Sequence, residues 1–168
     1  MNNLRTDSHD AKTIEVWNLV DAIQNRWWID AFTRGAYPEQ LVQEYGPLLS
    51  NVFNVGDNEI LKTQTDFLGI NYYCDGFVGK ARETDRPLNI SSPYPINKVA
   101  NMELPNSEYS EVTDFQWPIT PDGLGNLVLR INRDWPEIKS ILITENGAAF
   151  NDEPNEEGQV LDQRRVDY

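Results

Sequence analysis

Apolar residues recur at helical spacing in the N-terminal part of this chain. Val16, Val20, Ile23 and Trp27 follow one another at intervals of three or four residues, with polar residues between them. This spacing places the apolar side chains on one face of an amphipathic helix. We therefore expect a helix over about residues 11 to 31 whose apolar face turns toward a core.

Two shorter helical segments are predicted next. Gly35 interrupts the first pattern, and Tyr37-Pro38-Glu39 has a proline in a first turn and an acid near the positive end of a helix dipole. The helix that starts there should end near Gly46. A brief helical turn is expected at residues 57 to 63.

The period then changes to one typical of strands. Residues 65–74, TDFLGINYYC, are apolar and aromatic without polar alternation, and residues 139–144, KSILIT, form a second apolar run. Short runs of this kind are typical of parallel strands that are covered on both faces.

A further helix is predicted between the two strands. The chain from Asp75 to about Thr120 is irregular and rich in proline, and Pro121 then opens a helical pattern that ends before Pro136. The apolar face of this helix consists of Leu124, Leu127, Val128 and Ile131.

The order strand, helix, strand indicates a right-handed βαβ crossover. Residues 146–160 read as an acidic loop, and residues 162–168 resemble the first turns of another helix. Two strands cannot close a barrel of this type, which needs eight strands and typically about 250 residues. We therefore expect residues 1–168 to form a single incomplete α/β barrel domain, with unpaired strand edges and a half-covered apolar face.

Composition and charge exclude several functional classes. Of the 168 residues, 39% are hydrophobic and 24% charged, as in ordinary globular domains. The formal net charge of −13 disfavours nucleic acids and anionic membranes as partners, because both need a positive face. The N-terminus has neither the basic start nor the apolar stretch of a signal peptide, so nothing indicates secretion and we expect a cytoplasmic location.

The numbers of cysteine, histidine and aromatic residues further limit the kinds of site that the chain can form. Cys74 is the only cysteine and His9 the only histidine, which excludes a disulfide scaffold and a zinc site built from these residue types. Five tryptophans and seven tyrosines supply flat amphipathic rings, which serve in cores and also in sugar-binding clefts. Core packing accounts for most of them, and Trp27 and Trp28 are expected to anchor the first helix.

The second apolar run ends abruptly on a carboxylate. Residues 141–150 read ILITENGAAF, so Glu145 follows the strand directly. A strand needs a polar exit from the core, which is one explanation for this residue. The other is that α/β folds carry their chemistry at the carboxyl ends of parallel strands.

These segments resemble one family. ILITENGAAF is similar to the nucleophile signature of glycoside hydrolase family 1, the β-glucosidase family of retaining (β/α)8 TIM barrels. Three other stretches resemble the family in the same order: NRWWIDAFTRGAYPE, DFLGINYY at the place of the sixth barrel strand, and WPITPDGL before the penultimate helix. The resemblance implies a partial TIM barrel from about the fifth helix to the seventh strand and the start of the next helix.

The resemblance also implies a mechanism and roles for particular residues. Retaining glycosidases use two carboxyl groups roughly 5 to 5.5 Å apart, one as nucleophile and one as acid/base. Glu145 matches the nucleophile, which must be ionised to attack. Tyr73 matches the tyrosine that orients it, and Asn71 an asparagine of the sugar subsite, although these two residues could instead serve packing and capping. Trp117 resembles a tryptophan near the family's cleft, with roles at the rim or in the core equally compatible.

Important parts of the family's site are missing from this sequence. The family's acid/base is a glutamate in an Asn-Glu-Pro motif, and no such motif occurs in residues 1–168. Further sugar-binding residues of the family belong to barrel units outside this chain. The expected partner is a small β-glycoside or oligosaccharide; no cofactor and no metal is implied, and the oligomeric state is not predicted. We expect the isolated chain to be inactive.

Other functions stay open at this point. The chain could belong to a non-catalytic sugar-binding relative, although such a relative is free to replace Glu145. A thioglucosidase differs at the missing acid position, and a 6-phospho-β-glucosidase differs in a loop that the chain lacks. The sequence could also be a truncated form of a longer enzyme.

Overall fold

The computed structural model describes residues 1–6, 9–49, 52–78 and 111–168. None of the helices within these ranges is long and apolar enough to cross a membrane. The elements, in chain order, are β1 (Leu4–Arg5), α1 (Ala11–Asp21), the π-helical turn η1 (Ala22–Arg26), α2 (Trp27–Arg34), α3 (Glu39–Leu49), α4 (Asp57–Leu61), β2 (Leu68–Asn71), β3 (Gly76–Phe77), α5 (Pro121–Asp134), β4 (Ile141–Glu145) and α6 (Gln163–Asp167).

The first predicted helix is a composite of α1, η1 and α2. It begins after Asp10, whose carboxylate accepts a hydrogen bond from the Thr13 N–H and satisfies one of the free donors of the first turn. It ends at Gly35, which adopts the left-handed conformation with φ of 64°, as helix-terminating glycines do. The run is therefore longer than predicted and contains a π-helical turn that the sequence pattern did not indicate.

The expected anchoring by adjacent tryptophans holds for only one of them. Trp27 is partly buried and its ring lies 4.2 Å from that of Tyr37. Trp28 is 65% exposed, so its predicted anchoring role is wrong. The reason is geometric, since neighbouring residues in a helix point about 100° apart.

The next two helices lie where they were expected. α3 starts at Glu39 but extends three residues beyond Gly46 to Leu49, because a glycine inside a helix costs only about 1 kcal/mol and does not by itself end it. α4 covers most of the predicted helical turn.

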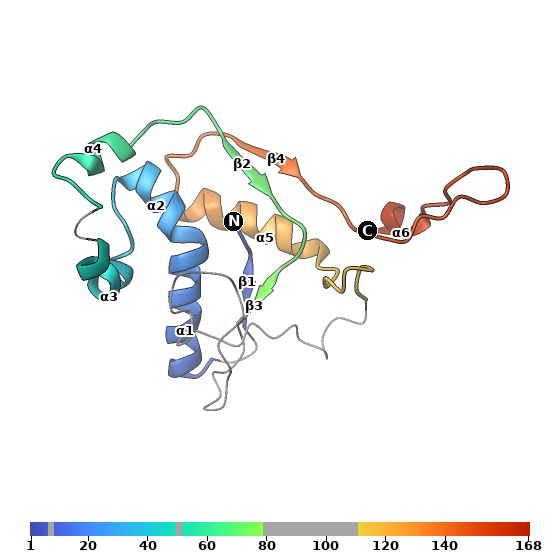
Figure 1. Ribbon diagram of the computed structural model, residues 1–168, viewed down its shortest axis with the longest axis horizontal. Helices are drawn as coiled ribbons and strands as arrows, with labels where there is room; N and C mark the ends of the chain where they lie inside the picture. Colours follow the sequence, from blue (N-terminus) through green and yellow to red (C-terminus); the bar gives the residue numbers. More distant parts are fainter. Residues whose placement is uncertain (7–8, 50–51, 79–110) are drawn as a thin grey trace.

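The two predicted strands pair in parallel, which confirms the predicted parallel strands. β2 and β4 are aligned from the Leu68–Ile141 pair to the Asn71–Glu145 pair, and Figure 1 shows them side by side. β2 is shorter than the predicted segment 65–74, and the strand resumes as β3, which pairs in parallel with β1. The sequence did not indicate β1, because a strand of two residues has no measurable period.

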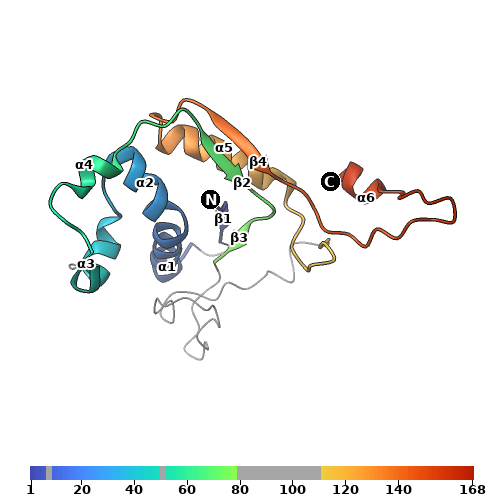
Figure 2. The same ribbon diagram turned by 45° about the horizontal axis from the view of Figure 1, so that its top comes forward.

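One side of the β2–β4 pair is covered by α5 (Figures 1 and 2). The apolar face predicted for this helix is confirmed, since Leu127 and Ile131 are buried and Leu124 packs against the same core. The half-covered apolar face expected of an incomplete barrel is also present, because Leu142 and Ile143 of β4 are exposed, whereas the strands of a complete parallel sheet are covered on both sides. The main core consists of Ile29, Ile70, Tyr72, Leu127, Ile131, Trp135 and Ile138.

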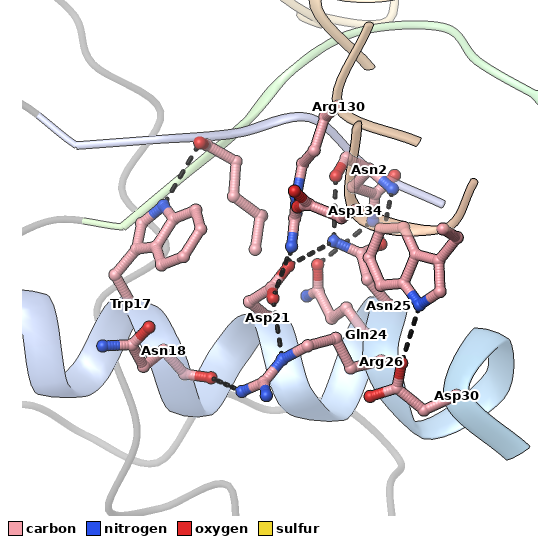
Figure 3. A network of polar contacts seen from close by, with 12 residues as sticks. Asn2, Trp17, Asn18, Asp21, Gln24, Asn25, Arg26, Asp30, Arg130 and Asp134 are labelled. Atoms are coloured by element: carbon pink, nitrogen blue, oxygen red, sulfur yellow. Dashed lines mark hydrogen bonds and ion pairs between the residues drawn. The ribbon is translucent and has the colours of Figure 1, made fainter. Parts of the chain in front are cut away.

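A buried ion pair joins α5 to the end of α1 (Figure 3). The Arg130 guanidinium donates to both carboxylate oxygens of Asp21, at 2.6 and 2.8 Å. The Asp21 carboxylate also accepts from Asn25 at 2.8 Å and from Arg26 at 3.0 Å. Because a buried charge is costly unless it is fully paired, this set of contacts fixes how α5 sits against the N-terminal helices.

The first turn of α5 approaches the end of β2 closely. Gly123 is buried, and a Cβ added there would overlap the Tyr72 hydroxyl and the Asp75 carboxylate. Gly125, two residues further along the same helix, is exposed and has open space around it. The lack of space therefore requires a glycine at position 123, whereas position 125 has room for a larger side chain.

We predict that Gly123→Ala lowers the free energy of unfolding by about 1 to 3 kcal/mol, because an added methyl group in a filled space forces its neighbours apart. Gly125→Ala is the matched control and should raise it by about 0.5 to 1 kcal/mol, because alanine has the higher helix propensity. Urea unfolding followed by circular dichroism measures both. Equal effects of the two substitutions would contradict the close approach at Gly123.

Loss of the buried ion pair should be costly, whereas loss of a surface pair on the same helix should not. The Arg130 side chain is 14% exposed, and Arg130→Met leaves the buried Asp21 carboxylate with Arg26 as its remaining ionic partner, which should lower the free energy of unfolding by about 1 to 3 kcal/mol. Arg133 is 73% exposed and pairs with Asp134, so Arg133→Met should leave the unfolding midpoint unchanged. The prediction fails if both arginine variants unfold at the same urea concentration.

Candidate active site

The candidate site lies where β2 and β4 end. Glu145 is the last residue of β4, and Asn71, the last residue of β2, is its partner in the ladder. The register shifts between Ile70 and Asn71, so the two ends meet after a local irregularity in the ladder. The parallel pairing thus brings both predicted side chains to one edge of the sheet.

The structure brings Tyr73 to the Glu145 carboxylate. The Tyr73 hydroxyl donates a hydrogen bond to Oε2 of Glu145. This hydrogen bond, together with desolvation and the negative charge of Glu145, raises the pKa of Tyr73 above its usual value. The phenol therefore stays protonated and continues to act as a donor to the carboxylate.

Backbone and side-chain hydrogen bonds hold the two strand ends together. The Tyr72 N–H donates to the Glu145 carbonyl at 2.9 Å. The Asn146 side chain donates to the Tyr72 carbonyl at 2.9 Å, and the Thr144 hydroxyl donates to Oδ1 of Asn71 at 2.6 Å. Thr144 and Asn146 therefore tie the end of β4 to the end of β2.

Trp117 lies beside the site at the base of a tight turn. Val112 and Pro118 form an antiparallel bridge, and Gln116 closes the turn with a positive φ of 61°. The Trp117 ring lies 5.5 Å from the Tyr73 ring and is 39% exposed. This position agrees with a place at the rim of the site rather than in the core.

The segment after Glu145 is tied back to the site by α6. Arg165 donates to the Ala148 carbonyl at 2.8 Å and pairs with Asp152 and Asp162. The Tyr168 hydroxyl donates to the Tyr73 carbonyl at 3.1 Å. These contacts were not predicted from the sequence, in which the pair of arginines after an acidic loop was the available signal.

The site contains one carboxylate that can act as a nucleophile or base, with a phenol and a carboxamide as hydrogen-bonding groups. An exposed indole face lies next to them. Within the described residues, no group of three or more acidic, histidine or cysteine side chains is placed to hold a metal ion.

Comparison with known proteins identifies relatives over almost the whole chain. The chain is 33% identical to Beta-glucosidase A from Acetivibrio thermocellus over 164 residues, which cover 96% of this chain and 33% of that protein. It is 31% identical to a 6-phospho-beta-galactosidase from Clostridium acetobutylicum over 179 residues, which cover 97% of this chain and 36% of that protein. The chain therefore spans about a third of the length of these relatives.

Solved structures agree with the sequence relatives. The psychrophilic beta-glucosidase from Micrococcus antarcticus superposes with a TM-score of 0.83 at 33% identity, over 100% of this chain and 37% of that chain. A beta-glucosidase from Exiguobacterium marinum gives a TM-score of 0.81 at 28% identity, over 100% of this chain and 35% of that chain. The predicted fold class, part of a (β/α)8 barrel, is confirmed by these structures. The sequence model described as "Glycosyl hydrolase family 1" matches residues 2–168, and the chain therefore belongs to that family.

Proposed function

We propose that this chain is the part of a retaining β-glycosidase that supplies the nucleophile. The observation that carries the proposal is the contact between the Tyr73 hydroxyl and the Glu145 carboxylate at the ends of two parallel strands, in a chain of glycosyl hydrolase family 1. In this proposal, residues 1–168 form one incomplete barrel domain.

Glu145 acts as the nucleophile at the anomeric carbon of the sugar. Its Oε2 accepts the hydrogen bond from Tyr73, which leaves Oε1 for attack and fixes the plane of the carboxylate. Because Glu145 is exposed, a substrate can reach its carboxylate from solvent. Attack forms a covalent glycosyl-enzyme intermediate, which water then hydrolyses in a second step.

Asn71 and Trp117 bind the substrate. The Thr144 hydroxyl donates to Oδ1 of Asn71, so the amide N–H groups of Asn71 stay available for a sugar hydroxyl. The exposed face of Trp117 is suited to the apolar face of a pyranose ring or an aglycone. Tyr73 contacts the Trp117 ring with its own ring and the nucleophile Glu145 with its hydroxyl.

The chain lacks the second catalytic group of this mechanism. The sequence contains no Asn-Glu-Pro motif, on which the family resemblance places the acid/base. General acid catalysis alone contributes about 10² to 10⁴ in rate, and missing subsites also remove orientation of the substrate. We therefore propose that the chain alone does not hydrolyse glycosides and that activity belongs to a complete barrel.

The proposed substrate is an uncharged β-glycoside, as the name of the Acetivibrio thermocellus relative suggests. A 6-phospho-β-glycoside is the second candidate, because a 6-phospho-beta-galactosidase is similar to the chain at nearly the same identity. The net charge of −13 favours the uncharged substrate, since like charges repel. A purely sugar-binding function is less favoured, because the nucleophile and the tyrosine that contacts it are both retained.

Glu145→Gln should lower the pKa of Tyr73 toward the ordinary value of about 10, because the phenol loses its hydrogen bond to the carboxylate and the phenolate no longer forms beside a negative charge. Carbon-13 labelling of the tyrosine rings, with Tyr73→Phe to assign the signal, allows this pKa to be measured by NMR titration. Glu137→Gln, which removes an exposed charge before the start of β4, is the control and should leave the pKa unchanged. An unchanged Tyr73 titration in Glu145→Gln would contradict the proposed contact.

Catalysis by Glu145 can be tested in a chimera. Residues 2–168 replace the matching segment of the Acetivibrio thermocellus beta-glucosidase, whose remaining segments complete the barrel. The chimera should hydrolyse p-nitrophenyl β-glucoside and lose at least about three orders of magnitude in kcat with Glu145→Gln, whereas Glu137→Gln should retain the rate. The isolated chain should give no turnover.

The covalent step has its own measurement in the same chimera. A 2-deoxy-2-fluoro-β-glucoside should slow release of the intermediate, so that mass spectrometry detects one sugar on the peptide that contains Glu145. An active chimera labelled on another residue, or turnover by the isolated chain that disappears with Glu145→Gln, would refute the corresponding part of the proposal.

A further inference from the structure

Asp75 is a buried carboxylate for which the proposed glycosidase mechanism has no role. It follows Tyr72 by three residues, lies between β2 and β3, and is 3% exposed. Burial of a carboxylate is unfavourable unless charged and polar partners surround it. Its position beside the strand end that carries Tyr73 therefore calls for an explanation.

The partners of Asp75 come from three separate parts of the chain. From the N-terminal strand region, Asn3 donates to Oδ1 at 3.0 Å and Arg5 pairs with Oδ2. The Tyr72 hydroxyl lies 2.8 Å from Oδ1. The Asp75 N–H donates to the hydroxyl of Thr120 at 2.9 Å, immediately before α5.

Tyr72, Asp75 and Thr120 form a closed ring of hydrogen bonds. The Asp75 N–H donates to Oγ1 of Thr120, the Thr120 hydroxyl lies 2.8 Å from the Tyr72 oxygen, and Tyr72 donates to the carboxylate. Desolvation raises the pKa of Tyr72 well above its usual value, and the hydrogen bond to Asp75 acts in the same direction. Tyr72 is therefore a permanent donor whose oxygen is fixed on the side of α5.

The ring of hydrogen bonds acts on the residue next to Tyr73. The backbone of Tyr72 is bound to the Glu145 carbonyl and to the Asn146 side chain, while its ring is held by Asp75 and Thr120. Tyr72 is buried with its ring in the core, and Tyr73 is exposed and contacts Glu145. Fixing the Tyr72 ring therefore fixes the direction in which the next side chain leaves the backbone.

We propose that Asp75 and Thr120 are positioning residues of the candidate site: they lock the Tyr72 ring on the side of α5 and thereby hold the Tyr73 hydroxyl on the Glu145 carboxylate. The inference rests on the proposed function for its catalytic meaning, but the geometric claim concerns this chain alone. Neither residue touches the substrate in this arrangement, and both act through Tyr72.

The test measures the pKa of Tyr73 in the chain as it stands, by NMR titration of carbon-13-labelled tyrosine with Tyr73→Phe for assignment. Thr120→Val and Asp75→Asn should each lower this pKa toward about 10, because Tyr73 loses its fixed contact with the carboxylate. Thr120→Ser keeps the hydroxyl and should restore the pKa of the unsubstituted chain. Ile131→Val is a core substitution in α5 that leaves the ring of hydrogen bonds intact, and it should leave the pKa of Tyr73 unchanged.

Circular dichroism spectra identify the variants that fold, and Thr120→Val provides the result if Asp75→Asn does not fold. A folded Thr120→Val whose Tyr73 titrates as in the unsubstituted chain overturns the positioning role and leaves the proposed function standing. An ordinary pKa for Tyr73 in the unsubstituted chain overturns both, because no contact with Glu145 would exist to be held. A pKa lowered equally by Ile131→Val assigns the effect to general loosening and also overturns the inference.

Discussion

The parallel pairing of β2 and β4 is the constraint on which the candidate site depends. Residues 72 and 145 are far apart in the sequence, and one hydrogen bond from the Tyr72 N–H to the Glu145 carbonyl joins them at the end of the ladder. The contacts of Tyr73 with the Glu145 carboxylate and of Asn146 with the Tyr72 carbonyl lie directly beside this hydrogen bond. The α5 helix supports the junction from one side through its buried face, so the chemistry at the strand ends depends on packing beneath them.

Much of this arrangement could be predicted from the sequence. Apolar runs without alternation indicated the two strands, and helical spacing indicated α5. The polar residues Thr144, Glu145 and Asn146, where the apolar run of ILITENGAAF stops, marked the edge where the site lies. These features are local, because spacing and composition within about ten residues determine them. The meeting of Glu145 with Tyr73 followed from the family resemblance together with parallel pairing, and not from spacing alone.

The features that the sequence did not reveal depend on contacts between distant segments. β1 consists of Leu4 and Arg5 and exists because β3 offers it a partner. Asp75 was assigned to an irregular stretch, yet it is buried and pairs with Arg5 from the N-terminal strand. Arg165 of α6 and Tyr168, the residue after this helix, donate hydrogen bonds to backbone carbonyls near the site. Local propensity carries no information about such pairings, since each requires the fold to be formed first.

The π-helical turn η1 changes which strands the continuous helical run of α1, η1 and α2 can pack against. Nine residues separate Val20 from Ile29, and at about 100° per residue an unbroken α-helix would point these two side chains in opposite directions. A wider turn absorbs roughly one extra residue and reduces this angle by about 90°. Val20 then packs with the β1 residue Leu4, and Ile29 packs with Ile70 of β2. A single irregular turn thus sets the rotation that lets one continuous helical run pack against β1 near its first half and against β2 near its second half.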